Sequence, residues 1–166
     1  MEMNKKETDA LKLGNELILR RYLFNKTKIN RLINEADYIM LHIIKDTGKE
    51  QEIYEGKTYL KDLSEKMQLT IRQTSKLVSG LKEQGYIKWS HDGDGNEGTY
   101  VMITDEGTKL LEQQQMIFKE YYEHIIEKFG KDNLIELLKL MKQLETVMCS
   151  EVERMEDQSD VDEGNE

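Results

Sequence analysis

The sequence predicts a mainly α-helical chain that carries one small β-hairpin near its centre. Two observations predict this fold class. Through most of the 166 residues, apolar side chains recur every three or four positions, which is the spacing of helices with one buried face. Two runs rich in aromatic and β-branched residues, 86–90 and 99–104, flank a glycine-rich loop and are typical of two paired strands.

Length and composition limit the class of protein. A chain of this length can bury the core of one domain, and its single cysteine, Cys149, excludes an internal disulfide and suits a reducing compartment. No segment approaches the roughly 18 apolar residues of a membrane span, and the first 14 residues contain no apolar run of a secretion signal. We therefore expect a cytoplasmic protein with no membrane partner.

The net charge of −9 is unevenly distributed. Residues 151–166 hold eight acidic residues and one arginine, whereas residues 57–90 hold seven lysines and arginines against three acids. Screening limits the reach of a charge to about 10 Å at ordinary salt, so the local balance matters more than the total. The pattern predicts a basic centre and an acidic, disordered tail.

The central residues predict a helix–turn–helix followed by a hairpin. A brief strand is expected at 57–59 and a helix over 60–67, where apolar residues share one face. Thr70 is the predicted N-cap of a second helix over 71–84, and Gly85 its C-terminal stop. With the hairpin that follows, this order is that of a winged helix.

Helices are also expected on both sides of this centre. A long helix is predicted within 11–33, and a short apolar helix over 37–44 that stops at Asp46-Thr-Gly48. After the hairpin, one helix runs from Asp105 to Gly130 and another starts at Asp132. Their apolar stripes are wider than a small domain needs, which predicts that a second copy covers them in a symmetric homodimer.

Two runs of the sequence resemble the MarR family of bacterial transcriptional regulators. One extends from Leu69 to Ile87 within LKDLSEKMQLTIRQTSKLVSGLKEQGYIKW, and the other, ITDEG, from Ile103 to Gly107. In that family the first run marks the recognition helix and the second leads from the wing into a dimerisation helix. The resemblance covers about 15–150. It implies a homodimer that binds double-stranded DNA at a pseudo-palindromic operator, with a small aromatic or lipophilic effector as a possible releasing ligand.

The resemblance also implies a division of the chain. We expect an N-terminal dimerisation region over 1–34 and a winged helix DNA-binding domain over 35–104. C-terminal dimerisation helices would follow over 105–150, and the acidic tail over 151–166.

The solvent side of the helix over 71–84 is the candidate DNA-reading surface. Arginine pairs well with guanine and glutamine with adenine, so Arg72 and Gln73 are candidates for base contacts, whereas lysines such as Lys66 suit phosphates. The alternative is a solvated helix face without a ligand. The residues that we expect to contact DNA are Thr70, Arg72, Gln73, Ser75, Lys76, Ser79, Lys82 and Lys88.

The loop His91-Asp-Gly-Asp-Gly-Asn-Glu-Gly98 is interpreted as the tip of the wing. It fails as a calcium loop, because the position that needs glycine is Glu97 and the position of the bidentate glutamate is Ile103. The family's wing carries an arginine for the minor groove, but this loop has no Arg or Lys. Asp92, Asp94 and Glu97 would instead repel phosphates. This acidity, with that of the tail, favours the alternative that the chain is a winged-helix protein-interaction module with weak or no DNA binding.

The remaining candidates indicate neither a metal site nor an enzyme. His42 lies in an apolar helix, and the other histidines are not at ligand spacing to it, so we expect no metal and no cofactor. Cys149 lacks basic neighbours that would make it a redox sensor. No catalytic constellation can be assigned. Aromatic residues could line an effector cavity but are more often core or interface, so the effector site stays unassigned. They are Tyr22, Tyr38, Phe118, Tyr121 and Tyr122.

Overall fold

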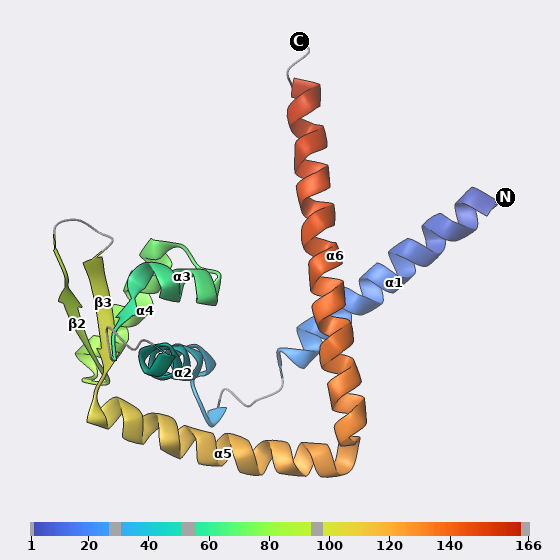
Figure 1. Cartoon of the computed structure of the whole chain (residues 1–166). Helices are drawn as coiled ribbons and strands as arrows, with labels where there is room; N and C mark the ends of the chain where they lie inside the picture. Colours follow the sequence, from blue (N-terminus) through green and yellow to red (C-terminus); the bar gives the residue numbers. More distant parts are fainter. Residues whose placement is uncertain (1, 27–30, 51–55, 94–97, 164–166) are drawn as a thin grey trace. The chain divides into compact units, whose positions relative to one another are not determined.

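The computed structural model describes residues 2–26, 31–50, 56–93 and 98–163. The chain divides into two compact units, Met1–Ile117 and Phe118–Glu166 (Figure 1). The predicted fold class, mainly helical with a small hairpin, is confirmed. The elements in chain order are α1 (Glu2–Phe24), α2 (Glu35–Glu50), β1 (Thr58–Tyr59), α3 (Leu60–Met67), α4 (Ile71–Glu83), β2 (Ile87–His91), β3 (Thr99–Ile103), α5 (Asp105–Phe129) and α6 (Lys131–Glu163).

The three strands form one antiparallel sheet in the order β1-β3-β2. Strands β2 and β3 make the predicted hairpin, in register with Trp89 opposite Val101. Beyond the last strand pair, the Asp92 N–H donates to the Gly98 carbonyl at 2.8 Å. Strand β1 is only two residues long, and Thr58 also lies opposite Val101 from the other side. The hairpin is therefore a wing whose base is braced by β1.

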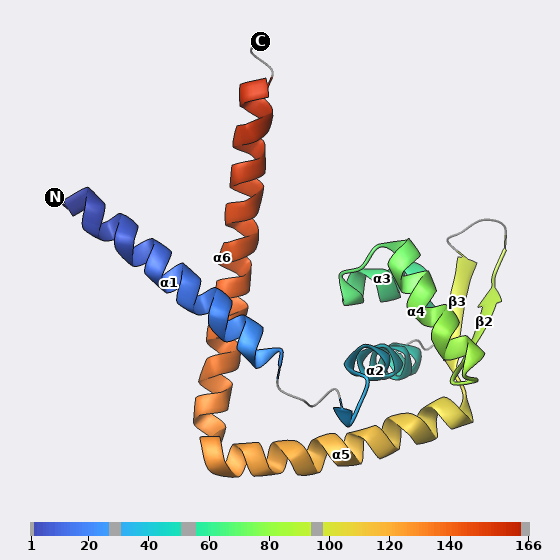
Figure 2. The ribbon, with the colours of Figure 1, turned by 180° about the vertical axis from the view of Figure 1, so that it is seen from behind.

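Helices α2, α3 and α4 gather beside this sheet and share one hydrophobic core with it (Figures 1 and 2). The first turns of α5 complete the core, to which they contribute the buried side chain of Leu111. The buried apolar residues of the cluster are Met40, Leu41, Ile44, Leu60, Leu63, Val78, Leu81, Ile87, Val101 and Leu111. Burial of this surface, at about 25 cal/mol per Å², is the main force that holds α4 against the sheet.

Helix α2 is longer than its sequence pattern predicts. The expected stop at Asp46-Thr-Gly48 is wrong, because α2 begins at Glu35 and continues to Glu50. Gly48 lies inside the helix, where a Cβ atom would stand 3.1 Å from the Cα of Gly56. The Gly56 N–H donates to the Gly48 carbonyl at 3.0 Å. This glycine therefore allows a close approach of two backbone segments and does not end the helix.

The two terminal helices also differ from expectation. The predicted helix within 11–33 begins earlier and ends earlier, since α1 spans Glu2–Phe24. The segment predicted to be a disordered acidic tail is instead helical in α6 up to Glu163. It contains neither proline nor glycine before residue 164, and Arg154 donates to Glu151 at 2.8 Å and to Gln158 at 3.2 Å. Such i,i+3 and i,i+4 contacts favour a helix despite the local charge.

Within the described ranges, every helix is too short or too polar to cross a bilayer.

The end of α4 is joined to the start of α5 by a set of short backbone contacts. Gly85, at φ +81°, ends α4 in the left-handed conformation that favours glycine. The Thr104 hydroxyl donates to the Gly85 carbonyl at 2.7 Å, while its N–H donates to the Tyr86 carbonyl at 3.0 Å. The Gly107 N–H in turn donates to the Thr104 hydroxyl at 3.0 Å, which caps α5. The junction thus connects the two runs that carry the family resemblance.

Gly107 is the residue of this junction that tolerates least change. A Cβ atom there would overlap the carbonyl oxygen of Tyr86, whereas one at Gly80 in α4 would meet no atom within 4 Å. We expect Gly107→Ala to lower the free energy of unfolding by about 1–3 kcal/mol, the usual cost of forcing a methyl group into a packed site.

The matched control is Gly80→Ala, which should raise the free energy of unfolding by about 0.5–1 kcal/mol because alanine is the better helix former. Urea unfolding at one fixed protein concentration measures both variants. Equal effects of the two substitutions would contradict the close approach at Gly107.

Candidate nucleic-acid interface

Helix α4 begins with the N-cap that the sequence predicts. The Gln73 N–H donates to the Thr70 hydroxyl oxygen at 3.2 Å, and the Thr70 N–H donates to the Gln73 side-chain carbonyl at 2.9 Å. These reciprocal bonds form a capping box, which satisfies two backbone donors that a helix start leaves unpaired. The Thr74 hydroxyl adds a third contact, to the Thr70 carbonyl at 3.0 Å. The first turn of α4 is therefore well defined before any ligand binds.

The two faces of α4 divide as expected. Thr74, Val78 and Leu81 are buried against the core. The predicted DNA-contact residues of the helix lie on the other face. Arg72, Gln73, Lys76 and Lys82 are exposed, and Ser75 and Ser79 are half-buried at its edge. One helix thus presents six of the eight predicted contact residues, and Thr70 precedes it as the cap.

Gln73 has a second role that the sequence analysis missed. Its side-chain carbonyl accepts bonds from both the N–H and the hydroxyl of Thr70, the latter at 3.1 Å. The bidentate contact of glutamine with adenine uses that same carbonyl together with the side-chain amide. Gln73 can therefore contact a base through its amide nitrogen, but a bidentate contact requires the capping box to open. The spacing Thr-x-x-Gln is the signal that could have revealed this role.

The lysines predicted to contact phosphates lie in three different places. The Lys82 ammonium lies 5.9 Å from the centre of the Trp89 ring, on the face of β2 that packs toward α4. Lys88 pairs with Met102 on the opposite face of the sheet, so the structure does not group it with α4. Lys66 donates to the Thr47 hydroxyl at 2.9 Å, which ties α3 to α2.

The described part of the acidic wing contains a compensated charge. The Lys57 ammonium contacts a carboxylate oxygen of Asp92 at 2.7 Å, and the Tyr59 hydroxyl donates to the same oxygen at 3.2 Å. The hydrogen bond from Lys57 is the largest cause that lowers the pKa of Asp92, and it likewise raises the pKa of Lys57. Both shifts favour the charged forms, so the pair is ionised at neutral pH. Asp94 and Glu97, the other two wing acids, lie outside the described residues.

His42 and Cys149 occupy exposed positions on helices. The His42 ring stacks on Tyr38 with centroids 6.0 Å apart and lies 3.4 Å from an Asp46 carboxylate oxygen. Its side chain is 46% exposed. Cys149 is exposed on α6. Within the described parts of the chain, no three His, Cys, Asp or Glu residues approach closely enough to hold a metal ion.

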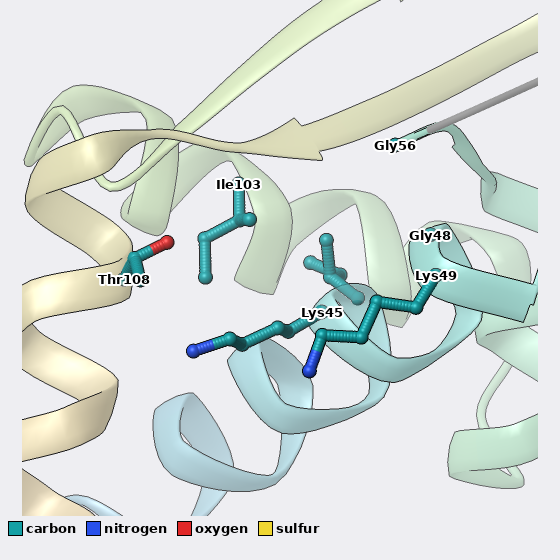
Figure 3. Close-up of a pocket in the computed structure, with 7 residues that line it drawn as sticks. Lys45, Gly48, Lys49, Gly56, Ile103 and Thr108 are labelled. Atoms are coloured by element: carbon teal, nitrogen blue, oxygen red, sulfur yellow. The ribbon is translucent and has the colours of Figure 1, made fainter.

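A shallow pocket of about 360 Å³ lies between α2, β3 and the first turns of α5 (Figure 3). Two lysines extend along one side of it, and one of them, Lys45, contacts Glu112 at 3.3 Å. The lining residues are Ile44, Lys45, Gly48, Lys49, Gly56, Ile103 and Thr108. None of the five aromatic residues considered for an effector cavity is among them, and the effector site stays unassigned.

The five aromatic residues considered for an effector cavity lie on three helices, α1, α2 and α5. On α5, Tyr122 contacts Tyr121 and Phe118, with ring centroids 5.2 and 6.0 Å apart. On α1, the ring of Tyr22 is exposed, with the Lys26 ammonium 4.9 Å from its centre. These contacts join neighbouring residues of one segment and do not outline a cavity.

No protein-family model matches the sequence. A curated protein to which it is similar is the HTH-type transcriptional regulator BilQ of Clostridioides difficile (strain CD3), with 25% identity over 95 residues. The matched region is 55% of this chain and 64% of BilQ, so the chain spans less than two thirds of that relative's length.

Solved structures similar to the chain include MarR proteins. MarR of Staphylococcus aureus in complex with salicylate and kanamycin superposes with a TM-score of 0.60 at 18% identity, over 89% of this chain and 97% of that chain. A mutant MarR of E. coli complexed with operator DNA gives a TM-score of 0.62 at 18% identity, over 80% and 97%. At such identities the comparison concerns the backbone, and it establishes that the chain has the winged helix-turn-helix fold of the MarR family regulators.

Proposed function

We propose that the chain is a DNA-binding transcriptional regulator that acts as a homodimer and reads a pseudo-palindromic operator with α4. The observation that carries the proposal is the exposed face of α4, where Arg72 and Lys76 lie one turn apart on a helix whose other face is buried. The fold supports it, since one MarR protein of this fold is complexed with operator DNA.

The chemistry of α4 suits a major groove. Thirteen residues make a helix about 20 Å long, and in helix-turn-helix proteins the N-terminal residues of this helix contact base edges. Arg72, in its first turn, can donate two parallel hydrogen bonds to a guanine. Lys82, near the far end beside Trp89, is placed for a phosphate contact that orients the helix without reading sequence.

The homodimer is supported by the apolar surface of the terminal helices. Leu137, Met141, Leu144 and Met148 recur at steps of four, three and four along α6, which places them on one stripe, and each is between 38% and 50% exposed. Helix α1 also exposes apolar side chains, namely Leu11, Leu13, Leu17, Ile18, Leu19, Tyr22, Leu23 and Phe24. Water-exposed apolar surface of this extent is unusual in a monomer, and a second copy would bury it.

The alternative function is a winged-helix protein-interaction module that binds DNA weakly or not at all. The wing loop without Lys or Arg and the eight acids of residues 151–166 favour it. The two functions differ in salt dependence. A DNA-binding protein loses affinity steeply with salt because each phosphate contact releases counterions, whereas an interaction module has no such slope.

Arg72→Ala should weaken binding to a genomic operator fragment about 10- to 100-fold, because one bidentate base contact contributes about 1–3 kcal/mol. Fluorescence anisotropy at several salt concentrations measures it. The control is Lys119→Ala on α5, which removes the same charge from an exposed side chain outside α4. Equal loss in both variants, or wild-type protein that shows no salt-dependent binding, would contradict the DNA-reading role of α4.

Substitutions at Gln73 should separate the cap from DNA contact. Gln73→Glu keeps an acceptor for the Thr70 N–H and adds a negative charge at the positive end of the helix, so thermal stability should be kept or raised. The same charge faces phosphates, so DNA affinity should fall. Gln73→Ala should lower the free energy of unfolding by about 0.5–2 kcal/mol through loss of the capping box. A Gln73→Glu variant that binds DNA as tightly as the wild type would argue against this face as the interface.

Leu144→Glu should convert the homodimer to a monomer, because it places a charge in the centre of the apolar stripe of α6. We expect a rise of about tenfold or more in the dimer dissociation constant, as for a central interface residue. Light scattering after size-exclusion chromatography measures the mass. Gln143→Glu is the matched control, since it adds the same charge to the exposed neighbour beside the stripe. A wild-type monomer, or an undisturbed Leu144→Glu dimer, would exclude this interface.

A further inference from the structure

Side chains from the β1 segment, from β3 and from the residue that follows β2 converge on one face of the wing sheet. Because the strand order is β1-β3-β2, the segment that leaves β2 is separated from β1 by β3. Asp92 nevertheless contacts Lys57 at 2.7 Å and Tyr59 at 3.2 Å, both of which belong to the β1 segment. The contact therefore crosses the full width of the sheet.

Tyr100 of β3 lies between the two ends of this contact. It is opposite Tyr59 on one side and Ser90 on the other, and side chains two residues apart share a face, which places Asp92 on the same face as Ser90. The Lys57 ammonium lies 4.4 Å from the centre of the Tyr100 ring, and the rings of Tyr59 and Tyr100 meet edge to face at 6.1 Å. The lysine is thus held by a ring beneath it and a carboxylate beside it.

The backbone of Asp92 is held as firmly as its side chain. Its N–H donates to the Gly98 carbonyl at 2.8 Å, the last described contact across the hairpin before the wing loop. A Cβ atom at Gly98 would overlap the Asp92 carbonyl, so the two backbones approach closely. Gly93 follows at φ +77°, where the loop begins. Asp92 is therefore fixed beside Gly98 at the end of the hairpin.

We propose that Asp92 is a positioning residue for DNA binding, which anchors the wing to the β1 segment through Lys57 and Tyr59 and supports binding although its charge repels phosphate. This inference rests on the proposed DNA-binding function. It assigns to one acid of the wing a role opposite to that suggested by its charge. The Asp92 carboxylate forms an ion pair with the Lys57 ammonium, so it does not act as an unpaired charge directed at the DNA.

The proposal and simple electrostatics predict effects of opposite sign. Asp92→Asn removes one negative charge and releases the positive charge of Lys57, and both changes favour a polyanion. On charge alone the variant should bind DNA more tightly. If Asp92 positions the wing, the variant should bind more weakly, because an uncharged amide holds the lysine less well.

The experiment measures the affinity of the full-length protein for a genomic operator fragment at about 0.15 M salt, with Asp92→Asn, Asp92→Glu, Lys57→Met and the double variant Lys57→Met/Asp92→Asn. Glu106→Gln is the matched control, since Glu106 is an exposed acid paired with Lys109 at 2.8 Å and its change removes the same charge. Thermal unfolding of each variant is measured in parallel.

We expect Asp92→Asn to weaken binding about fivefold, the size of effect typical of the net contribution of one hydrogen bond, with its Tm close to that of Glu106→Gln. Asp92→Glu should recover part of the affinity because it keeps the charge. The double variant should lose less than the product of the two single losses, as residues in contact do.

Three results would overturn the proposal. Binding by Asp92→Asn that is as tight as that of the wild type or tighter means that charge alone governs the wing. If Asp92→Asn lowers both Tm and DNA affinity, and Asp92→Glu recovers neither, the pair acts only on folding. Wild-type protein that fails to bind duplex DNA even at low salt removes the proposed function and this inference together, and it is distinguished from the other two by the wild-type control.

Discussion

The junction between α4 and α5 is the constraint on which the rest of the winged unit depends. Thr104 donates its hydroxyl to the Gly85 carbonyl and its N–H to the Tyr86 carbonyl, while Gly107 lets the α5 backbone lie against Tyr86. The same few residues end the candidate recognition helix, start β2 and cap the next helix. A shift at this junction would move the end of α4 and the start of α5 together, so the junction couples α5 to the exposed face of α4.

The candidate interface combines a preorganised helix with three exposed cationic side chains, those of Arg72, Lys76 and Lys82. The capping box of Thr70 and Gln73 fixes the first turn, and burial of Thr74, Val78 and Leu81 fixes the orientation of the helix. A ligand that contacts α4 need not order its backbone, which removes one cost of binding. The Gln73 side chain is less available for a base contact, because its carbonyl already accepts hydrogen bonds from Thr70 at the helix start.

The wing illustrates why net charge is a poor guide to local chemistry. By composition its loop is acidic and lacks any cation, yet Asp92 is compensated by Lys57, which lies 35 positions earlier in the chain. The positive charge of Lys57, which belongs to the basic centre of the sequence, is therefore partly neutralised. The negative charge of Asp92 is partly compensated in the same way. At distances several times its 2.7 Å separation, such a pair projects a much weaker field than either charge alone.

The sequence alone determined the features that depend on neighbours along the chain. The helix over 60–67, the cap at Thr70, the stop at Gly85 and the strand pair follow from apolar spacing and local hydrogen bonding, and all appear in the structure. The solvent face of α4 was predictable for the same reason. Only the tertiary structure decided features that depend on distant partners. Gly48 resembles a helix stop until Gly56 lies against it, and Asp92 resembles a repulsive charge until Lys57 reaches it across the sheet. Periodicity reports which side of an element is buried, but it carries no information about which remote group will meet that side.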